Sequence, residues 1–138
     1  MSSNEVWLFD VDACLFDSST GKSWRPGATR LIEHLIDTGC RVILWSAGGT
    51  EYAQQRARGC QVSHLFHAFE QKDQRDASGK YTLEFVDTFD NAVLVDDRPE
   101  DLPTDRVEVI TVRPYLVENR HDRGLDVCAK RQGISIFD

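Results

Sequence analysis

The sequence lacks several features that mark other classes of protein. No apolar run approaches the length of a membrane-spanning helix, and the first residues show no basic stretch followed by an apolar one. The four cysteines are far apart and show no C-x-x-C spacing, which argues against a zinc knuckle or a disulfide framework. The net charge of −7 repels phosphate backbones and argues against a general nucleic-acid binder. We therefore expect a soluble, cytoplasmic chain with reduced thiols that binds no membrane.

The length of 138 residues suits one domain with one hydrophobic core. The sequence contains no internal repeat, no low-complexity tract and no stretch with the composition of a linker. We expect residues 1–138 to form a single domain, and the sequence leaves a homo-oligomer open.

Short apolar runs alternate with segments of helical spacing, a pattern typical of an α/β fold with a mostly parallel sheet. Val42 to Trp45, for example, is a continuous apolar run that predicts a strand buried on both faces. Apolar residues recur at helical spacing between Pro26 and Gly39. The predicted strands are 6–9, 42–45, 62–69, 92–95 and 107–112, and the other predicted helices are 51–59, 82–89 and 122–131.

Two aspartates, Asp10 and Asp12, follow the first apolar run directly. Side chains at the carboxyl end of a parallel strand project into the crevice where open α/β sheets bind their ligands. Two carboxylates one residue apart can divide phosphoryl-transfer chemistry, because one can attack while the other moves protons. The pair therefore predicts an enzyme.

Further polar residues follow the other predicted strands at the same edge. Ser46 follows the second strand, a lysine lies between the third and the fourth, and Asp96 and Asp97 follow the fourth. A phosphate monoester is a dianion, so a site that attacks it with carboxylates needs a divalent cation, together with a lysine and a hydroxyl for the phosphoryl oxygens. A carboxylate-rich shell of oxygen ligands favours Mg²⁺ over zinc.

These residues resemble the four motifs of the haloacid dehalogenase (HAD) superfamily of phosphohydrolases. The motifs read W-L-F-D-V-D-A-C (residues 7–14), V-I-L-W-S (42–46), a lone lysine and V-L-V-D-D (93–97), and the resemblance covers roughly residues 5–112. It implies a Rossmann-like three-layer sandwich with strand order 5-4-1-2-3. It also implies a Mg²⁺-dependent phosphomonoester hydrolase that acts through an aspartyl-phosphate intermediate.

The resemblance assigns a role to each motif residue. Asp10 would be the nucleophile, and Asp12 would protonate the leaving group and then activate water. Ser46 would bind the phosphoryl group, helped by the backbone N–H of Ala47. Asp10, Asp96, Asp97 and the backbone carbonyl of Asp12 would form the metal site, with either Asp96 or Asp97 as the direct ligand.

The motif lysine has two candidates, Lys72 and Lys80. Lys80 is favoured because it lies 16 residues before Asp96 and directly before a predicted short helix, as in uncapped relatives that act on phosphoproteins. Lys72 adjoins a charged run that is typical of a solvated loop. The sequence departs from many relatives at Cys14, where they have threonine.

Spacing argues against a cap domain over the site. Only 13 residues separate Asp12 from Pro26, enough for a turn and a small hairpin. One helix and one strand fill the chain between Ser46 and Lys80. We therefore expect an open site that acts on a phosphorylated macromolecule or small molecule, with macromolecular substrates helping to exclude water.

Other functions remain alternatives at this point. A signalling receiver domain uses similar residues, but in a different order along the chain. A catalytically idle, phosphate-binding domain of the same fold and a polynucleotide 3′-phosphatase both fit the motifs, although the negative charge argues against a nucleic-acid substrate. The donor-rich segment 113–123 could select a substrate through its arginines or could be a solvated connection.

Overall fold

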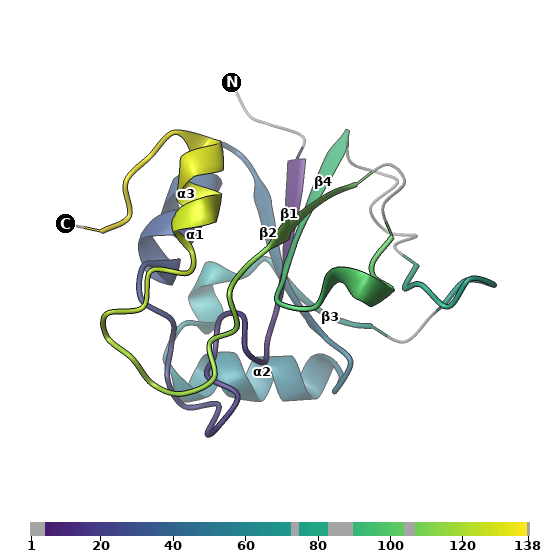
Figure 1. The fold of residues 1–138 in the computed structure, drawn as a ribbon, viewed down its shortest axis with the longest axis horizontal. Coiled ribbons are helices and arrows are strands. Elements are labelled where there is room, and N and C mark those ends of the chain that lie inside the picture. The colour runs from purple at the N-terminus through teal and green to yellow at the C-terminus, as the bar shows by residue number, and fades with distance from the viewer. Residues whose placement is uncertain (1–4, 73–74, 83–89, 104–106, 138) are drawn as a thin grey trace.

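A five-stranded parallel sheet forms the centre of the fold (Figure 1). The structure is a computed structural model that describes residues 5–72, 75–82, 90–103 and 107–137. The strands are β1 (Glu5–Asp10), β2 (Arg41–Ser46), β3 (Ala68–Gln71), β4 (Asn91–Asp96) and β5 (Glu108–Thr111). Their order, β3-β2-β1-β4-β5, is the predicted order read from the other edge, and each neighbouring pair is parallel. The predicted fold class is therefore confirmed.

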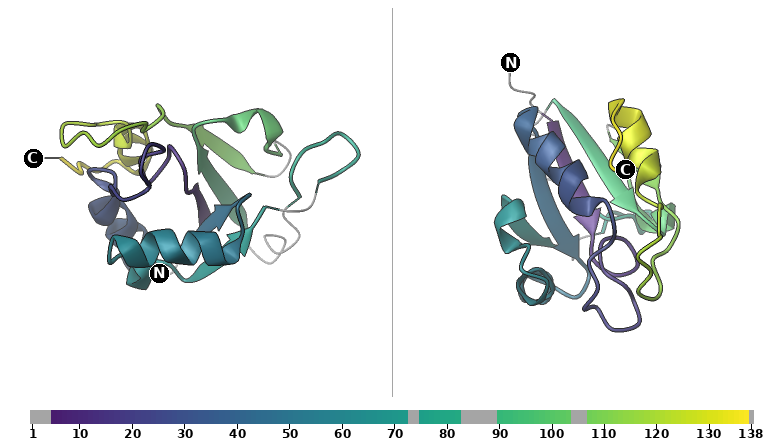
Figure 2. Two further views of the ribbon diagram at one scale, coloured as in Figure 1. Left: turned by 90° about the horizontal axis from the view of Figure 1, so that it is seen from below. Right: turned by 90° about the vertical axis from the view of Figure 1, so that its left-hand side faces the viewer.

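Three helices cover one face of this sheet: α1 (Ala28–Asp37), α2 (Thr50–Gly59) and α3 (Asp126–Gln132). Figure 2 shows α1 and α3 side by side against the strands. The alternation of a strand places Trp7 and Phe9 of β1 on this face, where they join the main core cluster. Leu31 and Leu35 of α1, four residues apart, both lie in the same cluster. No helix in the described ranges has the length and apolar character that a membrane crossing requires.

The opposite face of the sheet carries the intervening residues of the same strands. Val6 and Leu8 of β1 pack there with Leu102, which follows the 3₁₀ turn Pro99–Asp101. The half-buried ring of Tyr81 also packs against this cluster. The helix that the sequence predicts over 82–89 falls mostly on residues outside the described part of the chain.

Two element boundaries differ from the sequence prediction. The expected strand 62–69 is instead a 3₁₀ turn at Ser63–Leu65 followed by β3, which runs on to Gln71. The last helix begins at Asp126 instead of Asp122, because the Asp122 carboxylate accepts the backbone N–H of Gly124 and ion-pairs with Arg25. The third strand therefore ends later in the sequence than expected, and the last helix begins later.

The loop after β1 folds back on itself and joins the segment after β5. An antiparallel bridge pairs Phe16 with Trp24, which confirms the small hairpin predicted between Asp12 and Pro26. The fully buried guanidinium of Arg25 donates to the carbonyls of Cys14 and Arg113 and to the Asp122 carboxylate. These contacts fix the segment after β5 beside the carboxyl end of β1.

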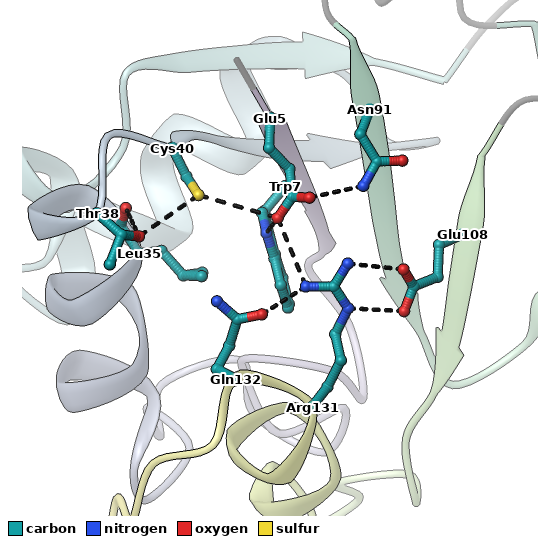
Figure 3. A network of polar contacts seen from close by, with 9 residues as sticks. All are labelled: Glu5, Trp7, Leu35, Thr38, Cys40, Asn91, Glu108, Arg131 and Gln132. Carbon is teal, nitrogen blue, oxygen red and sulfur yellow. Dashed lines mark hydrogen bonds and ion pairs between the residues drawn. The ribbon is translucent and has the colours of Figure 1, made fainter. Parts of the chain in front are cut away.

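A network of charged and polar side chains closes the amino-terminal end of the sheet (Figure 3). Arg131 of α3 binds the Glu108 carboxylate with two hydrogen bonds of 2.7 Å and lies 3.5 Å from Glu5. Glu5 also accepts hydrogen bonds from the Trp7 indole at 2.7 Å and the Asn91 amide at 2.6 Å. Both carboxylates of this network, Glu5 and Glu108, are thus engaged by donors of the chain itself.

Candidate active site

Three aspartates meet at the carboxyl end of the central strands. Asp10 is the last residue of β1 and Asp96 the last residue of β4, and these strands are neighbours in the sheet. Asp97 follows directly. One carboxylate oxygen from each of the three lies within 4.8 Å of the others. The sheet topology therefore brings together residues that are more than 80 positions apart in the sequence.

Lys72 is the cation of this cluster. It follows β3 directly, and its Nζ donates to Asp10 Oδ1 at 2.7 Å and to Asp96 Oδ2 at 3.1 Å. The ammonium also lies 4.8 Å from the centre of the Trp45 ring, and the lysine side chain is only 6% exposed. A buried ammonium is stable here because two carboxylates and an aromatic face surround it.

Burial and mutual repulsion shift the pKa values in this cluster. The pKa of Asp10 is raised to about 7: burial is the largest cause, Lys72 opposes it, and the charges of Asp96 and Asp97 act in the same direction as burial. The pKa of Asp97 is also raised, by burial and then by Asp96. Burial alone would lower the pKa of Lys72, but Asp10 and Asp96 outweigh it and raise this pKa. The cluster holds more negative charge than one lysine neutralises.

Ser46 ends β2 beside this cluster and is buried, with a relative exposure of 4%. Its Oγ accepts the backbone N–H of Gly48 at 3.0 Å, and its carbonyl accepts the N–H of Lys72 at 2.9 Å. The loop Ala47–Gly48 then leads into α2. Ser46 and this loop lie on the wall of the same cleft as the aspartates.

Asp12 lies at the entrance to the cleft, and its side chain is outside the three-aspartate cluster. The hydroxyl of Tyr52, in the first turn of α2, donates to Asp12 Oδ1 at 2.6 Å. Burial and then this hydrogen bond raise the pKa of Tyr52, so the phenol keeps its proton and remains a donor. The sequence does not predict this contact, because no sequence motif links a tyrosine in α2 to the loop after β1.

A cleft of about 650 Å³ contains the cluster, within the range usual for small-ligand sites. It is lined by the aspartates and Lys72, and also by Tyr81, Leu102, Pro114 and Leu116. The described residues contain no cap domain over it. In the segment 113–123, Pro114 and Leu116 reach this cleft, whereas Arg113, Arg120 and Arg123 line two other hollows.

Lys80, the favoured candidate for the motif lysine, does not lie in the cluster, whereas Lys72, the other candidate, does. The Nζ of Lys80 donates to the Leu102 carbonyl at 3.2 Å. The reason is that β3 ends at Gln71 and not at Phe69, so Lys72 comes directly after it, at the sheet edge that also holds Asp10. The departure at Cys14 leaves a fully buried thiol 3.5 Å from the Val95 carbonyl, and burial raises its pKa well above the usual range.

The donor set fits a hard divalent cation. Three carboxylates that approach one another within 4.8 Å repel unless a cation or protons lie among them, and all the ligand atoms are oxygen. Among the described residues, no histidine or cysteine joins this group, which separates it from the usual zinc sites. Asp10, Asp96 and Asp97 are therefore the side chains that could hold Mg²⁺.

Comparisons with known proteins first define the class. The fold matches an NMR structure of the core domain of a protein described as a phosphoglycolate phosphatase, from Streptococcus pneumoniae TIGR4. The match has a TM-score of 0.53 and 14% sequence identity, and covers 90% of this chain and 85% of that one. At this identity the likeness shows the fold alone. A search among curated proteins found no match.

The family follows from the sequence itself. The profile of the NLI interacting factor-like phosphatase family matches residues 6–131, nearly the whole chain. The chain therefore belongs to this family, and the resemblance to HAD phosphatases is confirmed.

Proposed function

We propose that the protein is a Mg²⁺-dependent phosphomonoester hydrolase that acts through an aspartyl phosphate on Asp10. The observation that carries this proposal is the cluster of Asp10, Asp96 and Asp97 around Lys72 at the carboxyl end of the sheet. Family membership supports the phosphatase class. The aspartyl intermediate and the role of each residue are the further content of the proposal.

In the first step, a carboxylate oxygen of Asp10 forms a bond to phosphorus while the bond from phosphorus to the leaving oxygen breaks. Asp12 gives its proton to that leaving oxygen. In the second step, Asp12 takes a proton from water, whose oxygen bonds to phosphorus and releases Asp10 and inorganic phosphate. The same side chain thus serves as acid and then as base.

The phosphoryl oxygens need donors throughout both steps. Ser46 Oγ, the backbone N–H of Ala47 and the Lys72 ammonium supply them in this proposal, from the ends of β2 and β3. Lys72 also favours the ionised form of Asp10, which is the form that attacks, because it contacts Oδ1 directly.

Asp10, Asp96 and Asp97, with the backbone carbonyl of Asp12, would hold Mg²⁺. The bound ion would neutralise charge on the phosphoryl group and on Asp10. The Asp10 carboxylate could then approach the doubly charged phosphate monoester. The excess of carboxylates over Lys72 supports this assignment.

The substrate is a phosphorylated macromolecule or small molecule that fits an uncapped cleft. The overall charge of −7 argues against nucleic acid as the substrate. A single domain over residues 1–138, a cytoplasmic location and a homo-oligomer stay predictions from the sequence.

The test is hydrolysis of p-nitrophenyl phosphate with Mg²⁺ or with chelator. We expect turnover by the wild type with Mg²⁺, none with chelator and none by Asp10→Asn. Asp37→Asn, which makes the same charge change on an exposed residue at the end of α1, should retain activity. A phosphorylated Asp10 found by mass spectrometry after acid quenching would support the intermediate. Turnover that survives Asp10→Asn would contradict the proposal, and a well-folded wild type that hydrolyses no phosphomonoester would indicate an idle binding domain.

A further inference from the structure

Tyr52 makes a single, short contact with the residue that the proposed function uses as acid and base. Its hydroxyl donates to Asp12 Oδ1 at 2.6 Å. Among the described residues, no other hydrogen bond reaches the Asp12 carboxylate, although Asp12 is exposed at the mouth of the cleft. An exposed aspartate side chain rotates freely unless a partner holds it. Tyr52 is the partner that holds this one.

The ring of Tyr52 is itself fixed from two sides. On one side it packs against Gly48, where an added Cβ would lie 3.1 Å from the ring. On the other side lies Arg56, one helical turn further along α2, with its guanidinium carbon 4.8 Å from the ring centre. Arg56 also donates to the Tyr52 hydroxyl at 3.3 Å. The phenol is therefore oriented before any substrate binds.

Arg56 connects this arrangement to the loop after β1. Its guanidinium lies against the backbone of Gly21, where an added Cβ would come within 2.6 Å of two of its atoms. The buried Nε of Arg56 has no hydrogen-bond partner in the described part of the chain. The position of Arg56 is thus set by packing between α2 and the loop, and its polar contact is with Tyr52.

We propose that Tyr52 is a positioning residue for Asp12: by holding Oδ1, it presents Oδ2 as the oxygen that exchanges protons with the leaving group and with water. The inference rests on the proposed function, because it assigns a task within that reaction. When the bond from phosphorus to the leaving oxygen breaks, the proton on Oδ2 moves to that oxygen. When water attacks the aspartyl phosphate, Oδ2 takes one proton from the water.

Dependence on the leaving group separates this task from a structural one. A nitrophenolate departs without a proton, whereas the less acidic phenol needs one in the transition state. Loss of a well-placed acid therefore slows hydrolysis of phenyl phosphate much more than that of p-nitrophenyl phosphate. A change that merely loosens the fold slows both substrates alike, since they are nearly the same size.

The experiment compares kcat/KM for these two substrates in the wild type and in Tyr52→Phe, with Mg²⁺ present. We use kcat/KM because it includes departure of the leaving group and excludes the later hydrolysis of the intermediate. We expect Tyr52→Phe to lose about tenfold or more with phenyl phosphate and less than about threefold with p-nitrophenyl phosphate. Asp12→Asn should show the same selectivity in a stronger form.

Tyr115→Phe is the matched control. It removes a phenol hydroxyl that accepts the backbone N–H of Asn119 at 3.1 Å, away from the aspartates. It should leave the ratio between the two substrates at the wild-type value, and thermal melting should show that both variants are folded. An unchanged ratio in Tyr52→Phe, or faster phenyl phosphate hydrolysis, would overturn the role of Tyr52 and leave the proposed function standing. No turnover of either substrate by the wild type would overturn both.

Discussion

The two ends of the sheet arrange their charged side chains in opposite ways. At the amino-terminal end, Glu5 and Glu108 share Arg131, and indole and amide donors complete the contacts of Glu5 (Figure 3). At the carboxyl end, three aspartates share only Lys72 among the described residues. At the first end donors of the chain reach both oxygens of each carboxylate. At the second end the three carboxylates outnumber their one lysine, and we call it the unmatched end, because an uncompensated cluster marks a place for a ligand of opposite charge.

This difference is also visible in the pKa values. At the amino-terminal end, the hydrogen bond from Arg131 lowers the pKa of Glu108. The ionised form of this carboxylate is therefore more stable in the folded chain than in the unfolded chain. At the carboxyl end, burial raises the pKa of Asp10 to about 7, so its charge is unfavourable in the folded chain without metal. The carboxyl end therefore lowers stability in order to keep a reactive group available.

The largest expected effect is on phosphatase activity and comes from replacing Asp10 at the unmatched end. Asp10→Asn should reduce phosphatase activity by at least about a thousandfold, because the nucleophile is lost.

Asp10→Asn should also stabilise the metal-free protein. The folded-state pKa of Asp10 lies above its unfolded value, so the wild type loses stability as the pH rises from about 4 to about 7. Chemical denaturation without metal should show a larger gain at pH 8 than at pH 5, and an equal or reversed effect would contradict the account.

Lys72 and Lys80 offer a matched pair for testing which cation belongs to the unmatched end. Lys72→Met should lower kcat/KM by about a hundredfold, since it removes a buried donor to Asp10 and to the phosphoryl group. Lys80→Met, which loses a contact with a carbonyl, should change it by less than about twofold. Steady-state kinetics on p-nitrophenyl phosphate measure both, and the reverse ranking would return the motif lysine to Lys80.

Breaking the matched end should affect stability and leave activity alone. Arg131→Gln leaves Glu5 and Glu108 without their cation, and we expect the free energy of unfolding to fall by about 2 kcal/mol. Lys130→Gln, its neighbour, breaks only an exposed ion pair with Asp126 and should cost less than about 0.5 kcal/mol. Urea denaturation gives both values. A loss of activity in Arg131→Gln under conditions where it is fully folded would show that the two ends are coupled.

The smallest expected effect concerns pH at the amino-terminal end. His67 precedes β3, its Nδ1 accepts the backbone N–H of Val42 at 2.9 Å, and burial lowers its pKa below 6.5. Because the folded pKa is lowered, the contribution of His67 is complete above pH 6.5 and decreases as the pH falls below it. We expect His67→Gln to remove a pH dependence of less than about 0.5 kcal/mol. The wild type and the variant should differ less in denaturation at pH 5.5 than at pH 7.5, and a difference that grows on acidification would contradict this.

The sequence predicted those parts of the site that directly follow strongly apolar strands. Asp10, Ser46 and Asp96 end β1, β2 and β4, whose buried runs are unmistakable in the sequence, so their shared sheet edge followed from the fold class. β3 is only partly buried and short, and the sequence placed its end at Phe69 instead of Gln71. Lys72 therefore appeared to belong to a solvated loop, while the spacing to Asp96 favoured Lys80.

Contacts between distant loops could not be predicted in this way. The hydrogen bond from Tyr52 to Asp12 depends on how α2 lies against the loop after β1, which packing decides. Arg25 is similar: its burial among Cys14, Arg113 and Asp122 depends on a segment almost a hundred residues away. Periodicity and motifs reveal elements and strand ends, but they carry no information on such pairings.

The most direct test of the account is Mg²⁺ binding, measured by calorimetric titration and by thermal shift on the wild type, on D96N/D97N and on Glu108→Gln. The double substitution leaves Asp10 with Lys72 and so removes the excess negative charge at the carboxyl end, whereas Glu108→Gln removes one carboxylate at the other end, outside the three-aspartate cluster. We predict that Mg²⁺ binds and stabilises the wild type and Glu108→Gln alike, by about 2.7 kcal/mol at a hundred times the Kd, and that D96N/D97N binds none. Equal binding by D96N/D97N, or no binding by the wild type, would contradict the claim that the unmatched aspartates form a metal site.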